Sequence, residues 1–311
     1  MALLSFVIPC YRSEDTIEKV INEVIEKVSE RECYDYEIIC VNDFSPDNVQ
    51  QVLESLASKN QRIKVANLSK NMGKHSALMA GYSVARGEYI ISLDDDFQSP
   101  TGELWRLLDS LIVDGNDFAT ARYRVKKQSL FKNMGSNVNH YMQKVMLNKP
   151  LSLRFENFFA MRRYVMLELL KYTRPYPYIE GLILRITRNI GQVTMEERDR
   201  FDDKPTGFTF NKSVSLWVNG LTAFSIKPLR IASLMGFLMA IAGFLFGLYL
   251  VIQRLVNPEI AIGFTSMVAI NLLGFGIVMI CLGIIGEYIG RIYICINDSP
   301  QFVIKSSINL D

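Results

Sequence analysis

Short apolar runs and amphipathic stretches alternate along the first part of the chain. The apolar runs have the length and the flanking turn residues of buried strands, and they lie at residues 3–9, 36–41, 63–68, 89–93 and 117–121. Between them, apolar side chains recur at helical spacing in residues 14–30, 49–57, 75–85 and 101–113. This alternation predicts an α/β fold with a mostly parallel sheet and helices on both faces.

Two long uncharged apolar runs follow much later in the chain. Residues 231–252 form a run that spans ~33 Å as a helix, enough to cross a bilayer, and residues 260–286 form a second one. Asn257 and Pro258 mark a turn between them. We therefore predict a transmembrane hairpin at residues 229–290, between a domain at residues 1–228 and a tail at residues 291–311. The alternative is a buried pair of soluble helices.

Flanking charges predict the orientation of this hairpin. Lys227 and Arg230 precede the apolar runs and Arg291 follows them, whereas the turn carries only Arg254. By the positive-inside rule, both termini and the first domain lie in the cytoplasm. The first nine residues are too short and lack the basic start of a signal peptide, which agrees with this placement.

Overall composition narrows the class of protein. The hydrophobic content of 49% favours a membrane-bound protein, and the net charge of +2 gives no field that would demand nucleic acid as a partner. The five cysteines form no CxxC pair, so we expect reduced thiols rather than a disulfide scaffold or a zinc site.

Three adjacent carboxylates follow the apolar run at residues 89–93. They are Asp94, Asp95 and Asp96, and Gln98 comes two residues later. In open α/β sheets, ligands bind at the carboxyl ends of the strands, and adjacent carboxylates repel one another unless a cation lies between them. Mg²⁺ and Mn²⁺ prefer such oxygen ligands. We predict Asp94 and Asp96 as metal ligands, with Gln98 as a third candidate; a solvated turn that caps the next helix is the alternative.

Two other strand ends carry polar or aromatic residues. Pro9 and Tyr11 follow the first strand, and Asn42 and Asp43 follow the second. A tyrosine offers its face to a base, and an aspartate accepts hydrogen bonds from a base or a ribose. No GxGxxG follows the first strand and no GxxxxGK[ST] occurs, which argues against a dinucleotide fold and a P-loop NTPase.

Four motifs carry a family resemblance. They read SFVIPCY at residues 5–11, VNDFSPD at 41–47, NMGKHSA at 71–77 and LDDDFQSP at 93–100. In this order they resemble the family 2 glycosyltransferases of the GT-A fold. The polyprenyl-phosphate branch, with the dolichyl-phosphate mannose synthases and bactoprenol glucosyl transferases, is the most similar. Residues 178–182, 224–230 and 286–291 extend the resemblance over almost the whole chain.

The resemblance implies an activity and a set of site residues. It implies inverting transfer of a sugar from a nucleotide sugar, commonly UDP-linked, to a polyprenyl phosphate such as undecaprenyl or dolichyl phosphate. Asp94, Asp96 and Gln98 would hold Mg²⁺ or Mn²⁺ as a DxDxQ motif. The implied nucleotide-binding residues are Pro9, Tyr11, Glu14, Asp43, Lys70, Asn71, Gly73 and Asp95.

The chain also departs from the family pattern. Asn42 replaces an aspartate, and Phe97 and Ser99 replace the leucine and the aspartate of the family's DxDLQDP sequence, although oxygen donors remain. Asn157 and Phe159 replace an acidic or hydroxyl residue and an arginine, which leaves Glu156 as a substitute catalytic candidate.

Basic residues suggest how anions are bound. Arg122, Arg124, Lys126 and Lys127 precede an amphipathic stretch at residues 129–147, which we predict to lie on the surface of an anionic bilayer. These cations could receive the lipid phosphate. Arg198, Arg200 and Lys204, in a stretch similar to the family's Arg-x-x-Gly-x-Ser, are candidates for the donor diphosphate or the acceptor phosphate. For residues 129–147, the alternative is a core-facing helix with a solvated basic face. For Arg198, Arg200 and Lys204, the alternative is an ordinary salt-bridged strand end.

Other functions remain open at this point. A polyprenyl phosphate is already anionic near neutral pH, so its transfer reaction needs no strong general base. A processive polysaccharide synthase would carry Gln-x-x-Arg-Trp, and neither Trp105 nor Trp217 lies in such a motif. A non-catalytic membrane scaffold is a third hypothesis, and nucleotide-sugar turnover would separate it from an enzyme. We also expect a homo-oligomer.

Overall fold

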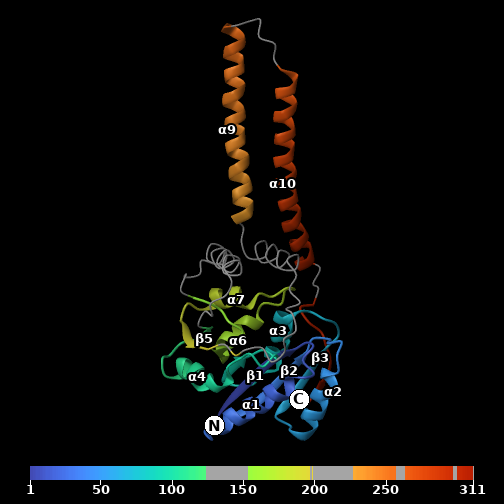
Figure 1. Ribbon diagram of the computed structural model, residues 1–311, viewed down its shortest axis with the longest axis vertical. Helices are drawn as coiled ribbons and strands as arrows, with labels where there is room; N and C mark the ends of the chain where they lie inside the picture. The colour runs from blue at the N-terminus through green and yellow to red at the C-terminus, as the bar shows by residue number, and fades with distance from the viewer. Residues whose placement is uncertain (124–152, 197, 199–226, 257–262, 297–299, 311) are drawn as a thin grey trace. The chain divides into compact units, whose positions relative to one another are not determined.

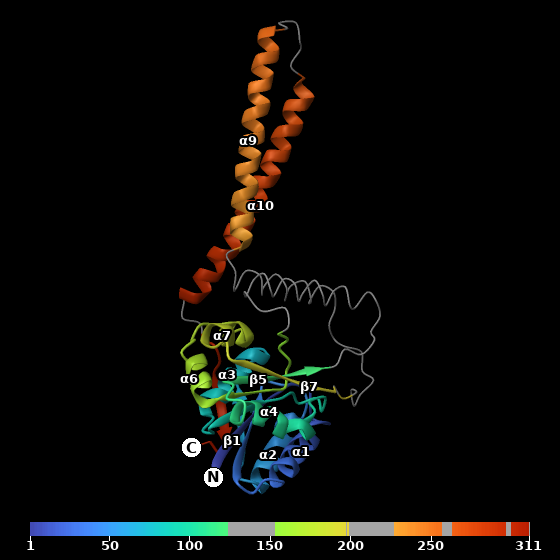
Figure 2. The same ribbon diagram turned by 90° about the vertical axis from the view of Figure 1, so that its left-hand side faces the viewer.

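The protein consists of two compact parts, seen in Figures 1 and 2. The computed structural model describes residues 1–123, 153–196, 198, 227–256, 263–296 and 300–310. The first unit comprises Met1–Gly207 together with Asp298–Asp311, and the second comprises Phe208–Asn297. The chain therefore leaves the first unit, forms the second, and returns to the first.

The first unit contains every strand and helix predicted for the first 121 residues. They are β1 (Ala2–Cys10), α1 (Ile17–Ser29), β2 (Tyr34–Asn42), α2 (Val49–Lys59), β3 (Ile63–Leu68), α3 (Lys74–Val84), β4 (Tyr89–Ser92), α4 (Leu104–Ile112) and β5 (Phe118–Tyr123). A short 3₁₀ helix, η1 (Thr101–Glu103), precedes α4. The hydrophobic periodicity thus identified these elements to within a few residues at each end.

Three further strands complete an eight-stranded sheet in the order β7-β5-β6-β4-β1-β2-β3-β8. They are β6 (Phe159–Arg162), β7 (Ile190–Met195) and β8 (Ile304–Ile308). β1 pairs in parallel with β2 and β4, β2 with β3, and β5 with β7. β6 lies antiparallel between β4 and β5, and β8 lies antiparallel to β3 at the edge. The mostly parallel α/β sheet is confirmed.

Helices cover both faces of this sheet, as Figures 1 and 2 show. On one face, α1, α2 and α4 pack on side chains such as Leu4, Phe6 and Ile8 of β1. On the other face, α3 packs with α6 (Arg163–Leu170) and α7 (Ile179–Ile186) on Val7 and its neighbours. Alternate residues of β1 face opposite cores because side chains in a strand point to the two faces in turn.

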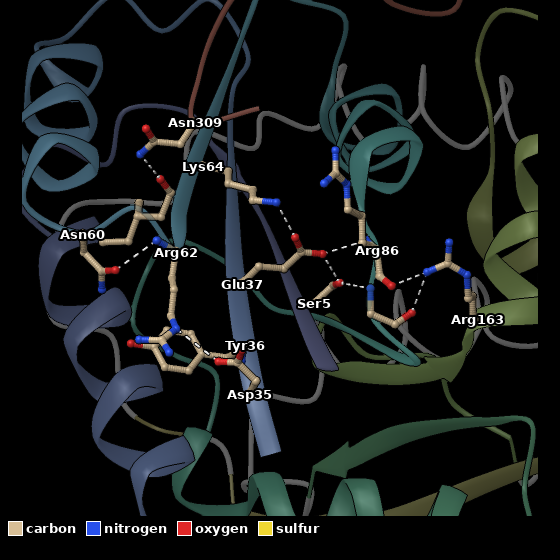
Figure 3. A network of polar contacts seen from close by, with 12 residues as sticks. Ser5, Asp35, Tyr36, Glu37, Asn60, Arg62, Lys64, Arg86, Arg163 and Asn309 are labelled. Carbon is tan, nitrogen blue, oxygen red and sulfur yellow. Dashed lines mark hydrogen bonds and ion pairs between the residues drawn. The ribbon is translucent and has the colours of Figure 1, made fainter. Parts of the chain in front are cut away.

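A buried polar network joins the strands near their amino ends (Figure 3). Glu37 of β2 is only 3% exposed. Its Oε1 accepts hydrogen bonds from Ser5 Oγ at 2.5 Å and from the Arg86 backbone N at 2.6 Å. Its Oε2 accepts one from Lys64 Nζ at 2.7 Å. Four segments, β1, β2, β3 and the turn before β4, are therefore tied together at one carboxylate.

The second unit is a pair of long helices, α9 (Lys227–Val256) and α10 (Phe264–Ile296). They run side by side in both views (Figures 1 and 2) and contact one another. Each contains an 18-residue window apolar enough to cross a membrane, Ala232–Tyr249 and Leu273–Gly290. Large apolar side chains such as Phe237, Phe244 and Phe275 are exposed along them. α9 contains the whole first apolar run, residues 231–252, and α10 contains most of the second, residues 260–286.

The structure differs from the prediction after the second apolar run. The predicted tail at residues 291–311 begins inside α10, because apolar residues continue the helix to Ile296. The same tail also contains β8, which pairs with β3 at the edge of the sheet. We predicted no element there, since the IKSSI sequence of β8 shows no strong apolar pattern.

Candidate functional site

A cavity lies at the carboxyl ends of β1, β2 and β4. Its volume is about 350 Å³, and it is lined by Pro9, Cys10, Tyr11, Asp43, Asn71, Gly73, Lys74, Asp94, Asp95 and Asp96. The parallel pairing of β1 with β2 and with β4 brings these strand ends to one edge of the sheet. Most of the residues that the motifs singled out are thus gathered around one cavity, although they come from four segments of the chain.

The three carboxylates after β4 have different surroundings. Asp95 Oδ2 accepts a hydrogen bond from the Tyr11 backbone N at 2.8 Å. Burial raises the pKa of Asp95 to about 7; the neighbouring Asp94 and Asp96 add to this rise, and the Tyr11 N–H opposes it. Asp96 Oδ1 accepts from the Gln98 backbone N at 3.1 Å. Asp95 therefore ties this turn to the end of β1, while all three carboxylates border the cavity.

Asp43 holds the loop that follows β3. Its two carboxylate oxygens accept hydrogen bonds from the backbone N atoms of Met72 and Gly73, at 2.7 and 2.9 Å. Burial raises the pKa of Asp43, and these two hydrogen bonds act in the opposite direction. Gly73 has a φ of 83°, a backbone conformation that favours glycine, and it immediately precedes α3. Asp43 thus shapes the chain that leads into the first turn of α3.

An exposed aromatic side chain stands at the end of β1. Tyr11 is 43% exposed and lines the cavity. Arg12, next to it, lies with its guanidinium 5.6 Å from the tyrosine ring centroid. A flat, partly solvated ring with a polar hydroxyl is well suited to stack on a planar heterocycle.

Sequence reasoning missed two lining residues, Cys10 and Lys74. Lys74 is the first residue of α3, and its Nζ donates a hydrogen bond to Asp94 Oδ1. The available signal was its place directly after Gly73, the glycine that precedes α3, because a cation at a helix N-terminus beside a glycine turn is suited to phosphate. Cys10 is buried, and its Sγ donates to Ile8 O at 3.4 Å.

The residues around the cavity fit a divalent metal only together with a ligand. Among the described residues, no three His, Cys, Asp or Glu side chains converge into a ready-made metal site. Asp94 and Asp96 supply carboxylate oxygens at the cavity wall, and Lys74 already places positive charge against Asp94. Mg²⁺ is usually bound by one or two carboxylates, with substrate phosphates and waters completing its shell. The donor set therefore fits such an ion shared with a phosphate-bearing ligand.

Comparison with known families accounts for both parts of the chain. The sequence profile described as "Glycosyl transferase family 2" matches residues 5–170. The chain belongs to glycosyl transferase family 2. A second profile, "GtrB C-terminal hairpin", matches residues 227–292, which include all of α9 and most of α10. The chain is thus a glycosyltransferase with a C-terminal hairpin.

Curated relatives of this glycosyltransferase match it along almost its whole length. The undecaprenyl-phosphate 4-deoxy-4-formamido-L-arabinose transferase of Proteus mirabilis is 31% identical, covering 99% of this chain and 94% of the relative. The uncharacterized glycosyltransferase YkcC of Bacillus subtilis is 29% identical, with coverage of 99% and 94%.

Solved structures share the fold of the first unit. The crystal structure of glucosyl-3-phosphoglycerate synthase from Mycobacterium tuberculosis with Mn²⁺ and uridine-diphosphate-glucose matches with a TM-score of 0.50 and 19% identity. The match covers 66% of this chain and 73% of that protein. The family's GT-A-like fold, with its mostly parallel sheet, is therefore the fold of this glycosyltransferase.

Several predicted site residues lie elsewhere than the cavity wall. Glu14 Oε2 accepts a hydrogen bond from Asn48 N at 2.8 Å, so this carboxylate caps the N-terminus of α2. Lys70, Gln98 and Glu156 are also not among the lining residues. The Glu156 backbone N donates to Thr120 Oγ1 at 3.1 Å, just before β6.

The departures from the family pattern near Glu156 have a structural setting. Phe159 is the first residue of β6 and is buried, with its ring centroid 5.2 Å from that of Phe118. Asn157 is exposed on the preceding bend. Phe159 is therefore a core residue, and the arginine of the family pattern has no counterpart at this position.

The predicted phosphate-binding cations divide into three groups. Arg122 is exposed near the end of β5. Arg198 is paired with Glu23 of α1, with Nη1 to Oε2 at 2.8 Å, and its guanidinium lies 5.3 Å from the ring centroid of Phe97. The remaining cations, and the predicted interfacial helix at residues 129–147, lie outside the described residues; these cations are Arg124, Lys126, Lys127, Arg200 and Lys204.

Proposed function

We propose that this glycosyltransferase transfers a sugar from a nucleotide sugar, with uridine as the base, to a polyprenyl phosphate at the cytoplasmic face of a membrane. One observation carries the proposal. A cavity lined by acidic residues, with an exposed aromatic ring and a lysine, lies in the same chain as two helices apolar enough to cross a membrane. Relatives named as undecaprenyl-phosphate transferases support the acceptor class.

The donor nucleotide would be bound by residues at the ends of β1 and β2. Tyr11 offers an exposed ring face to the base. Asp43 lines the same cavity and would accept hydrogen bonds from the base or the ribose. The first turn of α3, with Gly73 and Lys74, presents positive charge to the diphosphate.

Asp94 and Asp96 would hold a divalent metal, Mg²⁺ or Mn²⁺, against the donor diphosphate. Such an ion, when bound, supplies positive charge that stabilises the leaving nucleoside diphosphate. Lys74 is placed to add to this effect, because its Nζ already contacts Asp94 at the cavity wall. The bound Mn²⁺ and nucleotide sugar in the structural neighbour from Mycobacterium tuberculosis support a divalent ion in general.

The acceptor would attack the sugar from the side opposite the diphosphate and invert the anomeric centre. Its phosphate oxygen forms the new bond to the anomeric carbon while the bond from that carbon to the nucleotide oxygen breaks. A phosphate oxygen is anionic near neutral pH, so the step needs no strong base. This is consistent with the finding that Glu156 is not among the residues that line the cavity.

A radiolabel transfer assay tests this proposal. Detergent-solubilised protein would be mixed with Mn²⁺ or Mg²⁺, undecaprenyl phosphate and a panel of labelled nucleotide sugars, and the label followed into the organic phase. We expect a metal-dependent lipid product with one or a few uridine donors. In the control reaction, a chelator removes the metal, and we expect no lipid product.

Two results would contradict the proposal in different ways. Label released only as free sugar would rule out the lipid phosphate as the acceptor while leaving the donor site intact. Transfer only from donors with another base would refute uridine as the donor base but would still support a polyprenyl phosphate as the acceptor.

A further inference from the structure

The strand that follows the hairpin in sequence, β8, forms the edge of the sheet next to β3. β8 pairs antiparallel with β3, with Asn67 opposite Ser306. The pairing continues past the end of β3, where Ser69 N donates to Val303 O at 2.9 Å. Asn309 fixes the far end of β8, because its Nδ2 donates to Ala57 O and to Ile63 O, both at 2.9 Å.

A chain of side-chain hydrogen bonds crosses from β8 to β2. Asn67 Nδ2 donates to Ser306 Oγ at 3.1 Å, and Asn67 Oδ1 accepts from Asn42 Nδ2 at 3.0 Å. Asn42 Oδ1 then accepts from the Ser45 backbone N at 3.0 Å. Asn42 and Asn67 are 4% and 5% exposed, so their amide groups depend on these partners rather than on water.

The chain of hydrogen bonds ends at the wall of the cavity. Ser45 Oγ accepts a hydrogen bond from the Arg12 backbone N at 2.7 Å. Arg12 and Phe44 have positive φ angles of 58° and 52°, unusual for residues other than glycine. They directly adjoin the cavity residues Tyr11 and Asp43. Strained backbone of this kind persists only where the surrounding structure holds it.

We propose that β8 is a positioning element for the nucleotide cavity. The path Ser306–Asn67–Asn42–Ser45 holds residues 42–45 and the backbone of Arg12, and through them it orients Tyr11 and Asp43. The expected effect of this path on nucleotide binding rests on the proposed function. The hydrogen bonds of the path do not depend on it. In the sequence, the hairpin therefore lies between the residues that line the cavity and the strand that positions them.

The chain offers a matched set of variants to test this role. Ser306→Val and Ser306→Thr have side chains of nearly the same shape, but only threonine keeps the hydroxyl group that Asn67 contacts. Ser307→Val on the same strand is the control, because Ser307 is exposed like Ser306 but lies opposite Ala66 in the pairing and not opposite Asn67. All variants would be made in the full chain and purified in detergent.

Two measurements are compared across this set. Hydrogen–deuterium exchange of peptides that cover residues 42–48 reports the order of the loop without any ligand. Calorimetric titration with UDP in the presence of Mn²⁺ gives the dissociation constant of the cavity for this nucleotide. For Ser306→Val we expect faster exchange in this loop and a dissociation constant for UDP raised about fivefold, the size of effect expected from one lost hydrogen bond. Ser306→Thr and Ser307→Val should behave as wild type.

The outcomes distinguish this proposal from the proposed function. Equal exchange rates for residues 42–48 in Ser306→Val and Ser306→Thr would overturn the positioning role, even if both variants unfold at a lower temperature than wild type. A difference in exchange, in a protein that binds no UDP in any form, would support the positioning role and count against uridine as the donor base.

Discussion

The carboxylates after β4 are the residues on which the proposed chemistry depends most directly. We expect Asp96→Ala to lower sugar transfer at least about 100-fold, because the charge that develops on the leaving diphosphate would lose its metal-mediated stabilisation. The thermal unfolding temperature should stay close to that of wild type, since Asp96 borders a cavity rather than the core. The measurement is the radiolabel assay at saturating Mn²⁺.

The control for this variant is Asp114→Ala, which removes an exposed carboxylate after α4. Full transfer by Asp96→Ala in the presence of metal would show that the metal assignment is wrong.

Glu37 matters for stability rather than for chemistry. Glu37→Gln would leave Lys64 without its anionic partner in a mostly buried position, and we expect a loss of about 3 kcal/mol in the free energy of unfolding. Glu54→Gln on the exposed side of α2 should change little. Thermal unfolding of the detergent-solubilised variants measures both.

The same carboxylate predicts a pH dependence. Burial alone would raise the pKa of Glu37, but hydrogen bonds from Lys64, Ser5 and the Arg86 N–H outweigh it and lower the pKa below its ordinary value of 4.5. The stabilisation is therefore present above about pH 4.5 and is lost as the pH falls through the folded-state pKa. The difference between wild type and Glu37→Gln should shrink in that range; a constant difference down to pH 3 would contradict this.

Sequence patterns identified some of the residues that line the cavity, but not the residues whose partners are distant in the sequence. Asp43, Asp94 and Asp96 could be predicted because they follow apolar runs that end at one edge of a parallel sheet. Glu37 and Ser306 could not be predicted, because their partners are 27 and more than 200 residues away along the chain. The contact between Glu14 and the backbone N of Asn48 was not foreseeable either, because these residues are 34 positions apart along the chain.

At the scale of elements, the close packing of α3 on the sheet determines where Lys74 is held. A Cβ atom at Gly81 would lie 2.3 Å from Val7 Cγ1 and 3.1 Å from Val41 Cγ2. Gly81→Ala should therefore destabilise the protein by roughly 1–3 kcal/mol, although alanine is the better helix former. We also expect weaker UDP binding, because α3 must move away from β1. Thermal unfolding and UDP titration are the measurements.

Ser83→Ala, on the exposed side of the same helix, is the matched control. An unchanged unfolding temperature for Gly81→Ala would mean that α3 is less tightly packed than the structure indicates.

The predictable elements were those with a strong hydrophobic pattern. The helices α1 and α4 each bury one regular apolar face, and β1 to β5 are apolar runs bounded by turn residues. β6 is a four-residue strand that ends in the charged Arg162, and β8 is largely polar, so neither stands out from a loop. β8 is an edge strand whose outer side meets solvent, and Lys305 within it is typical of such edges.

At the scale of the whole molecule, the apolar helices α9 and α10 determine how the protein can be handled. We expect it to sediment with membranes after lysis, to resist an alkaline carbonate wash, and to be released by detergent, because many large apolar side chains are exposed along both helices. Immunoblotting of the fractions is the measurement. Recovery in the supernatant after lysis without detergent would refute the transmembrane hairpin.

The division of the chain also bears on orientation. Residues on both sides of the hairpin belong to one compact unit that contains a continuous sheet. If both helices cross a bilayer, the segments before α9 and after α10 must therefore lie on the same side of it. This agrees with the flanking charges, which predict the cytoplasmic side.

The position of β8 in the chain has a consequence for biosynthesis. A ribosome makes β3 long before β8, and it makes α9 and α10 between them. Until the hairpin has been synthesised, the edge of β3 has no partner strand and the path to Asn42 lacks its last member. If β8 orders the nucleotide cavity as we propose, a nascent chain acquires a finished donor site only after both apolar helices have been synthesised. The order of translation would then keep the enzyme inactive until its hairpin exists.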